Sequence, residues 1–115
     1  MSENWQHAGT IEDFPEDNKL SVAVGDWQVL LIRDGDDLHA FNDCCTHQAS
    51  RLSPGRVRRG AIMCPLHGAR FEVATGRCMG GAYPDLKTFP VRQDAGRIEV
   101  AVPSDPPGQG ERPQP

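Results

Sequence analysis

Two short segments, each with one cysteine and one histidine, constrain this chain most. They read Cys45-Thr46-His47 and, after sixteen intervening residues, Cys64-Pro65-Leu66-His67. Two thiolates and two neutral imidazoles are ligands typical of a metal centre. A fold that uses all four must bring two loops together and clamp the metal between them. If the centre holds two irons, the cysteine and histidine of each loop diverge toward different irons.

Tetrahedral zinc is an alternative for the same four side chains, because two cysteines and two histidines also satisfy it. Zinc fingers pair two cysteines in one knuckle and two histidines on one helix. Here each loop carries one of each, and neither is followed by a helical pattern. The spacing therefore favours a [2Fe–2S] cluster with two thiolates on one iron and two imidazoles on the other. All four positions are filled, which argues against a site that has lost its cluster.

The pattern C-x-H, a spacer, then C-P-x-H-G resembles the Rieske family, over roughly residues 5–102. The resemblance implies that Cys45, His47, Cys64 and His67 bind one [2Fe–2S] cluster, with each histidine bound through Nδ1. It also implies an all-β Rieske fold of stacked small antiparallel sheets, with the cluster held at the tips of two hairpin loops. The segment 80–84, Gly-Gly-Ala-Tyr-Pro, resembles the family's third loop, which covers the cluster, although a plain connecting loop is the alternative.

Two features that raise the potential of high-potential Rieske proteins are absent at the matching positions. Those proteins carry an extra cysteine in each ligand loop, forming a disulfide, where this chain has Ser50 and Leu66. They also place serine and tyrosine hydroxyls after the second histidine, where this chain has Ala69 and Phe71. The resemblance therefore implies a reduction potential near the low end of the Rieske range, at about −150 mV.

Composition and turn signals independently predict an all-β domain. The 115 residues include 12 glycines and 10 prolines, and helical apolar periodicity is hard to find. We expect strands over residues 4–7, 21–24, 27–32, 38–41, 60–63, 71–73, 86–91 and 97–102. Asp34-Gly35 and Asp94-Ala95-Gly96 predict the turns of two hairpins. In the last hairpin Ile98, Val100 and Val102 should face one way.

The domain is expected to cover residues 1–102, followed by a disordered tail over 103–115. The tail holds five of the ten prolines and no large apolar residue. The N-terminus lacks a basic region followed by an apolar one, and the longest apolar run, 29–32, has four residues. These observations predict a cytoplasmic protein with no membrane span, and we take a monomer as the default.

The remaining cysteines and histidines are expected to lie outside the ligand set. Cys44 should point away from its neighbour Cys45, although the assignment of Cys45 rests on the C-T-H triplet, and a register that uses Cys44 stays open. Cys78 is most simply a small buried hydrophobe. His7 and His39 lie outside any ligand spacing and are expected at the surface.

A formal net charge of −4 hides an uneven distribution of charge. Acidic residues gather at 12–17 and 34–37, while Arg51, Arg56, Arg58 and Arg59 lie between the two ligand pairs. These arginines either steer an acidic partner toward the cluster or are merely solvated, and the sequence leaves both open. Nucleic-acid binding is not expected, because the chain is acidic and lacks aromatics around the arginines.

The resemblance also implies a function. A free-standing, low-potential Rieske domain is similar to the ferredoxin of bacterial ring-hydroxylating dioxygenase systems. Such a protein carries single electrons from a flavin-dependent NAD(P)H reductase to the Rieske cluster of a terminal oxygenase. It is not itself an enzyme, since the oxygenase's two-histidine, one-carboxylate iron site has no counterpart here. The alternatives are the small Rieske-like subunit of an assimilatory nitrite reductase and a zinc-binding structural module.

Overall fold

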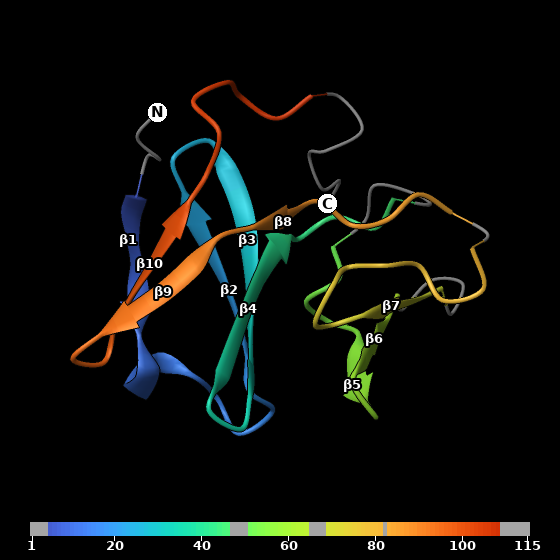
Figure 1. Ribbon diagram of the computed structural model, residues 1–115, viewed down its shortest axis with the longest axis horizontal. Helices are drawn as coiled ribbons and strands as arrows, with labels where there is room; N and C mark the ends of the chain where they lie inside the picture. The colour runs from blue at the N-terminus through green and yellow to red at the C-terminus, as the bar shows by residue number, and fades with distance from the viewer. Residues whose placement is uncertain (1–4, 47–50, 65–68, 82, 109–115) are drawn as a thin grey trace.

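Three small antiparallel sheets make up the computed structural model, which describes residues 5–46, 51–64, 69–81 and 83–108 (Figure 1). The four-stranded sheet, in the order β2-β3-β4-β8, consists of β2 Lys19–Val24, β3 Trp27–Asp34, β4 Asp37–Asn42 and β8 Thr88–Phe89. A second sheet, in the order β1-β10-β9, consists of β1 Trp5–Thr10, β10 Arg97–Ala101 and β9 Val91–Asp94. The third consists of β5 Arg56–Arg58, β6 Ala61–Met63 and β7 Arg70–Glu72. The expected all-β fold is confirmed; one 3-10 turn, Ile11–Asp13, is also present.

The four-stranded sheet separates two cores, and its strand β3 is buried on both faces. Val29, Leu30, Leu31 and Ile32 of β3 are all at most 1% exposed, which explains the continuous apolar run. Alternate residues of the run serve different cores, because successive side chains point to opposite faces.

We call the two cores the body core and the loop-side core. The body core lies between the central sheet and β1-β10-β9, and its members are Ala8, Val24, Trp27, Val29, Leu31, Ala40, Phe89, Ile98, Val100 and Val102. The loop-side core lies on the other face, toward β6 and β7. Its members are Leu30, Ile32, Phe41, Cys45, Leu52, Ile62, Cys64, Ala69, Phe71, Val73, Cys78 and Leu86.

The last hairpin shows one confirmed and one wrong prediction. Ile98, Val100 and Val102 all face the body core, as their alternation predicts. The partner strand, however, is β9 instead of 86–91. Residues 86–90 lead in from the other sheet, where β8 pairs with β4, so one apolar stretch is divided between two sheets.

The β5-β6-β7 sheet contains a strand that the sequence pattern did not predict. β5 has a single apolar residue, Val57, between two arginines, so it carries little periodic signal. It pairs with β6 through a turn at Arg59 and Gly60, both of which have positive φ, at 52° and 76°. β6 and β7 then form the hairpin that carries the second ligand loop.

Residues 103–108 continue along the body, beyond the predicted domain end at 102. The Trp27 indole N–H donates to the Asp105 carbonyl at 3.1 Å, and Pro107 is buried. The division into a domain and a disordered tail stays a prediction, and these contacts argue against placing its boundary at 102. Residues 109–115 of the predicted tail lie outside the described residues. Within the described ranges no helix is long and apolar enough to cross a membrane.

Candidate metal centre

The structure brings the two predicted cysteine ligands into one buried region. Cys45 follows the end of β4, and Cys64 follows β6 directly. Both belong to the loop-side core, with exposed fractions of 0% and 1%. His47 and His67, the other two predicted ligands, lie outside the described residues. In the described ranges alone, therefore, no group of three metal-binding side chains is found.

The second ligand loop closes the β6–β7 hairpin. The Cys64 N–H donates to the Ala69 carbonyl at 2.7 Å, so the chain leaves and re-enters the sheet at adjacent positions. This agrees with a ligand at a hairpin tip. The first ligand loop differs, because it joins β4 to β5 in another sheet instead of closing a hairpin.

A buried carboxylate holds the two ends of the first ligand loop together. Asp43 is fully buried, and its Oδ1 accepts hydrogen bonds from the backbone N–H groups of Leu52 and Ser53, at 2.8 Å each. Its Oδ2 accepts from the Ser21 hydroxyl at 2.6 Å, and Ser21 in turn accepts from the Gln28 amide. A buried carboxylate is stable only when it is paired or hydrogen-bonded in this way. Asp43 therefore ties the backbone of Leu52 and Ser53 to Ser21 of the central sheet.

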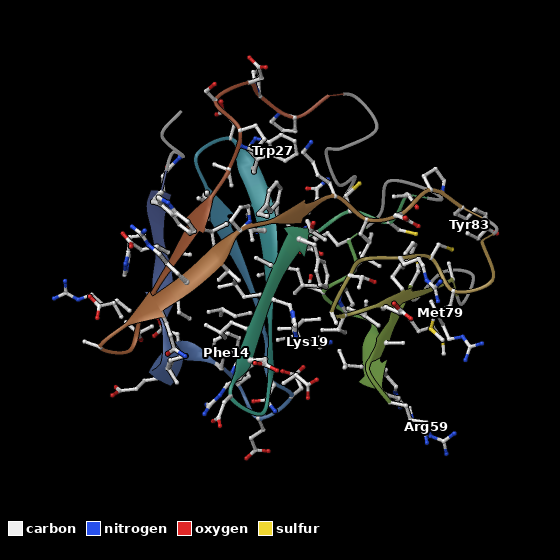
Figure 2. All side chains as sticks on the ribbon, viewed as in Figure 1. Phe14, Lys19, Trp27, Arg59, Met79 and Tyr83 are labelled. Carbon is white, nitrogen blue, oxygen red and sulfur yellow. The ribbon has the colours of Figure 1, made fainter. Side chains whose placement is uncertain are left out.

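Lys19 braces the segment that follows this loop (Figure 2). Its side chain is 9% exposed, and its Nζ donates to the carbonyls of Ser53, at 2.7 Å, and Gly55. A longer ion pair with Asp17, at 3.6 Å, partly balances the charge. Since the stem of lysine packs while its ammonium group needs acceptors, this arrangement ties loop backbone to β2.

Gly55 is required where the segment after the first ligand loop passes close to Met63 of β6. A Cβ at this position would lie 2.0 Å from the carbonyl oxygen of Met63, the residue before Cys64. No side chain fits there without moving the backbone. The close approach keeps the end of the first loop segment against the start of the second.

The third loop lies beside the first ligand loop. The Thr46 hydroxyl, between the two predicted ligands of that loop, donates to the Pro84 carbonyl at 2.6 Å. Tyr83 packs against the loop-side core, and the Asp85 carboxylate accepts from the Cys78 N–H at 2.9 Å. This position suits a covering role; Ala82 of the loop lies outside the described residues.

The positions that govern the predicted potential are apolar and buried where the structure describes them. Ala69 is 9% exposed and Phe71 0% exposed, and both belong to the core that holds the two cysteines. Neither side chain can donate a hydrogen bond to a sulfur atom. Ser50 and Leu66, the positions of the missing disulfide, lie outside the described residues.

The other cysteines and histidines lie where the sequence placed them, with one exception. Cys78 is buried in the loop-side core, and Cys44 is buried without belonging to either core as the structure describes them. His7 is exposed on β1, as predicted. His39 is only half-buried, because it is on β4 beside Ile32 instead of at an open surface.

Sequence reasoning missed Asp43, Lys19 and Gly55 as residues that position the site. The available signal was Asp43 itself, a carboxylate placed directly after a buried strand and before the ligand loop. Its partners are 9 and 10 residues away, and those of Lys19 are 34 and 36 residues away. No local sequence pattern predicts contacts over more than thirty residues, such as those of Lys19.

Known proteins resemble this arrangement in sequence and fold. The family model described as the Rieske [2Fe–2S] domain matches residues 4–90. The ferredoxin component of the naphthalene 1,2-dioxygenase/salicylate 5-hydroxylase systems of a Ralstonia species is 34% identical over 103 residues, covering 89% of this chain and 99% of its own. A chain in the solved complex of reduced oxygenase and oxidized ferredoxin in carbazole 1,9a-dioxygenase is 30% identical, with a TM-score of 0.76 and coverage of 87% of this chain and 94% of that one.

A second type of protein shares the fold. The structure of a putative NADH-dependent nitrite reductase small subunit from Mycobacterium tuberculosis matches with a TM-score of 0.79, covering 91% of this chain and all of that one. Its sequence is 23% identical, so this similarity shows the fold alone. The sequence-level similarity described above is to the ferredoxin component.

Proposed function

Since this chain belongs to the Rieske [2Fe–2S] domain family, we propose that it carries single electrons from a flavin-dependent NAD(P)H reductase to the Rieske cluster of a terminal aromatic-ring-hydroxylating oxygenase. The observation that carries the proposal is the match to a dioxygenase ferredoxin component over 99% of that protein's length. A relative of this kind is a carrier and not a catalytic enzyme. Both electron-transfer partners are part of the proposal.

The cofactor of this family is a Rieske-type [2Fe–2S] cluster, which supplies a one-electron couple when bound. The described residues fit it, because two thiols of separate loops are buried in one core with apolar neighbours. We propose Cys45 and Cys64 as the ligands of one iron and His47 and His67 as those of the other. Asp43, Lys19 and Gly55 hold the loop segments, and Thr46 ties the first loop to the third.

The nitrite reductase alternative has weaker support, because that similarity is below 25% identity and concerns the fold. As an obligate subunit, the chain would form a stable stoichiometric complex with a large siroheme subunit. The zinc alternative predicts a colourless protein, whereas an iron–sulfur protein is red-brown.

The test is a reconstituted electron-transfer chain. The holoprotein is mixed with NADH and the purified reductase and oxygenase of the naphthalene dioxygenase system to which the Ralstonia relative belongs. Reduction of the oxygenase cluster is measured by its change in absorbance. We expect this reduction only when this chain is present. The Cys64→Ser variant, which loses a proposed ligand, is the control and should not support it. A holoprotein that the reductase reduces but that never reduces the oxygenase would contradict the proposal.

A further inference from the structure

The outer face of the β5-β6-β7 sheet forms a groove of about 510 Å³. Arg56, Met63 and Arg70 lie side by side across its three strands. Ile62 and Phe71, their neighbours along the strands, point the opposite way into the loop-side core. We name this surface the arginine groove; its lining includes Arg56, Arg58, Arg59, Arg70, Met63 and Met79.

None of the four arginines is paired with a carboxylate in the described part of the chain; Glu72, on the same face of β7 as Arg70, is paired instead with Arg77 at 3.2 Å. All four are exposed, none takes part in an ion pair found there, and the lining contains no aspartate or glutamate. This positive charge is gathered on a protein whose net charge is −4. Clustered like charges repel one another. Approaching carboxylates offset this repulsion and lower the electrostatic free energy of the groove.

Two methionines provide an apolar centre between the arginines. Met63 is 41% and Met79 39% exposed, and they are the exposed large hydrophobic residues found in the described ranges. Met79 is fixed beside β7 by its N–H, which donates to the Arg70 carbonyl at 2.8 Å, and Figure 2 shows Arg59 projecting from the β5–β6 turn. Methionine adapts to different surfaces, and both methionine and arginine are enriched at protein interfaces.

The groove lies next to the proposed metal site. Met63 directly precedes Cys64, and Arg70 follows Ala69, whose carbonyl closes the second ligand loop. A protein seated in the groove therefore contacts the two strands that hold this loop. Arg51, expected from the sequence to belong to this basic region, does not line the groove, whereas Arg70 does.

We propose that the arginine groove is the docking surface for a redox partner protein that presents carboxylates around an apolar patch. The inference rests on the proposed function, since it assumes a partner that exchanges electrons with this chain. The field of the four arginines would speed the encounter, and arginine forks would pair with carboxylates. The small methionine centre would supply contact area suited to a short-lived redox complex.

The first test uses small redox probes. The reduced holoprotein is oxidised by anionic ferricyanide and, separately, by cationic hexaamminecobalt(III), at low and high ionic strength. Replacing all four arginines by glutamine should slow the ferricyanide reaction by about ten-fold at low salt, less at high salt, and speed the cobalt reaction. Arg70→Gln and Arg97→Gln form a matched pair of exposed strand arginines, of which only the first should change the rates. Unchanged paramagnetic resonance spectra verify that the cluster is intact.

The second test uses the naphthalene-system oxygenase as the protein probe. Arg70→Gln should lower its rate of reduction and the dependence of that rate on salt, while Met63→Gln with Met79→Gln should weaken binding without altering the salt dependence. If wild type cannot reduce the oxygenase, the proposed function fails, while the ferricyanide comparison still decides whether the groove steers anionic partners.

Three results would overturn the inference. Arg70→Gln and Arg97→Gln could behave alike with both small probes. Inorganic phosphate could bind the wild type tightly and the four-arginine variant not at all, which would assign the groove to a small anion. Sedimentation could show a dimer that the same substitutions abolish, which would assign it to a second copy of this chain.

Discussion

The two faces of the central sheet show how differently one chain can be held together. On the body side, strands of four to eight residues, together with the two-residue β8, pack apolar side chains from two sheets. On the loop side, the strands of the β5-β6-β7 sheet have three residues each, and the core also contains residues that lie outside strands, such as Leu52, Cys78 and Leu86. There Asp43 and Lys19 fix loop backbone beside the central sheet by hydrogen bonds to residues 52–55. The body side is a scaffold, while the loop side depends on polar anchors and, as we propose, on the metal.

The largest effect is expected from the proposed imidazole ligands. His47→Ala and His67→Ala should each abolish the Rieske paramagnetic resonance signal, because one iron loses a nitrogen ligand. His7→Ala and His39→Ala, whose side chains belong to the scaffold strands, should leave the signal intact. An unchanged signal in either ligand variant would contradict the proposed set of four ligands.

Substitutions at two adjacent residues of β3 allow the two cores to be tested separately. Leu30 and Leu31 are both fully buried, in the loop-side core and the body core respectively. Replacing either by alanine should cost about 2–5 kcal/mol in the free energy of unfolding, measured by denaturant titration. Only Leu30→Ala should also alter the resonance line shape, since Leu30 belongs to the same core as Cys45 and Cys64. Equal spectral changes in both variants would mean that the two cores do not act separately.

A smaller effect is expected at the polar anchor. Asp43→Asn keeps the shape of the side chain but replaces a charged acceptor by a neutral amide. Because Asp43 accepts two backbone N–H groups and one hydroxyl, the loss should be about 1–3 kcal/mol. Hydrogen exchange at Leu52 and Ser53 should rise, while that of β10 stays the same. Exposed Asp94→Asn is the control, and matching exchange rates in both variants would contradict the anchoring role.

The smallest effect is expected at the contact between the first and third loops. Thr46→Val removes the hydroxyl that donates to the Pro84 carbonyl. The expected loss in stability is about 1 kcal/mol, with faster bleaching of the cluster in air as the covering loop loosens. Thr75→Val, which removes an exposed hydroxyl bonded to Glu72, is the matched control. Equal bleaching of the two variants would argue that the third loop gives no protection.

These differences also explain what the sequence could predict. Alternation predicted which side chains of β10 face the core, and the Asp34-Gly35 turn predicted the β3–β4 hairpin, because those signals come from strand and turn geometry. The Cys-His spacing predicted the ligand set, of which the structure describes only the cysteines, both in one core. β5 went unpredicted because it has one apolar residue, and the grouping of Arg70 with Arg56 depends on strand register. Lys19 binds backbone more than thirty residues away, a contact set by the tertiary fold.

The most direct test is a paramagnetic resonance spectrum of the dithionite-reduced protein, with a redox titration of the same signal. We expect a signal whose average g lies below that of four-cysteine clusters and a potential near about −150 mV, since Ala69 and Phe71 offer no hydroxyl to the sulfur atoms. A colourless protein containing zinc would contradict the cluster assignment. A strongly positive potential would contradict our interpretation of these two positions and the proposed role as a dioxygenase ferredoxin.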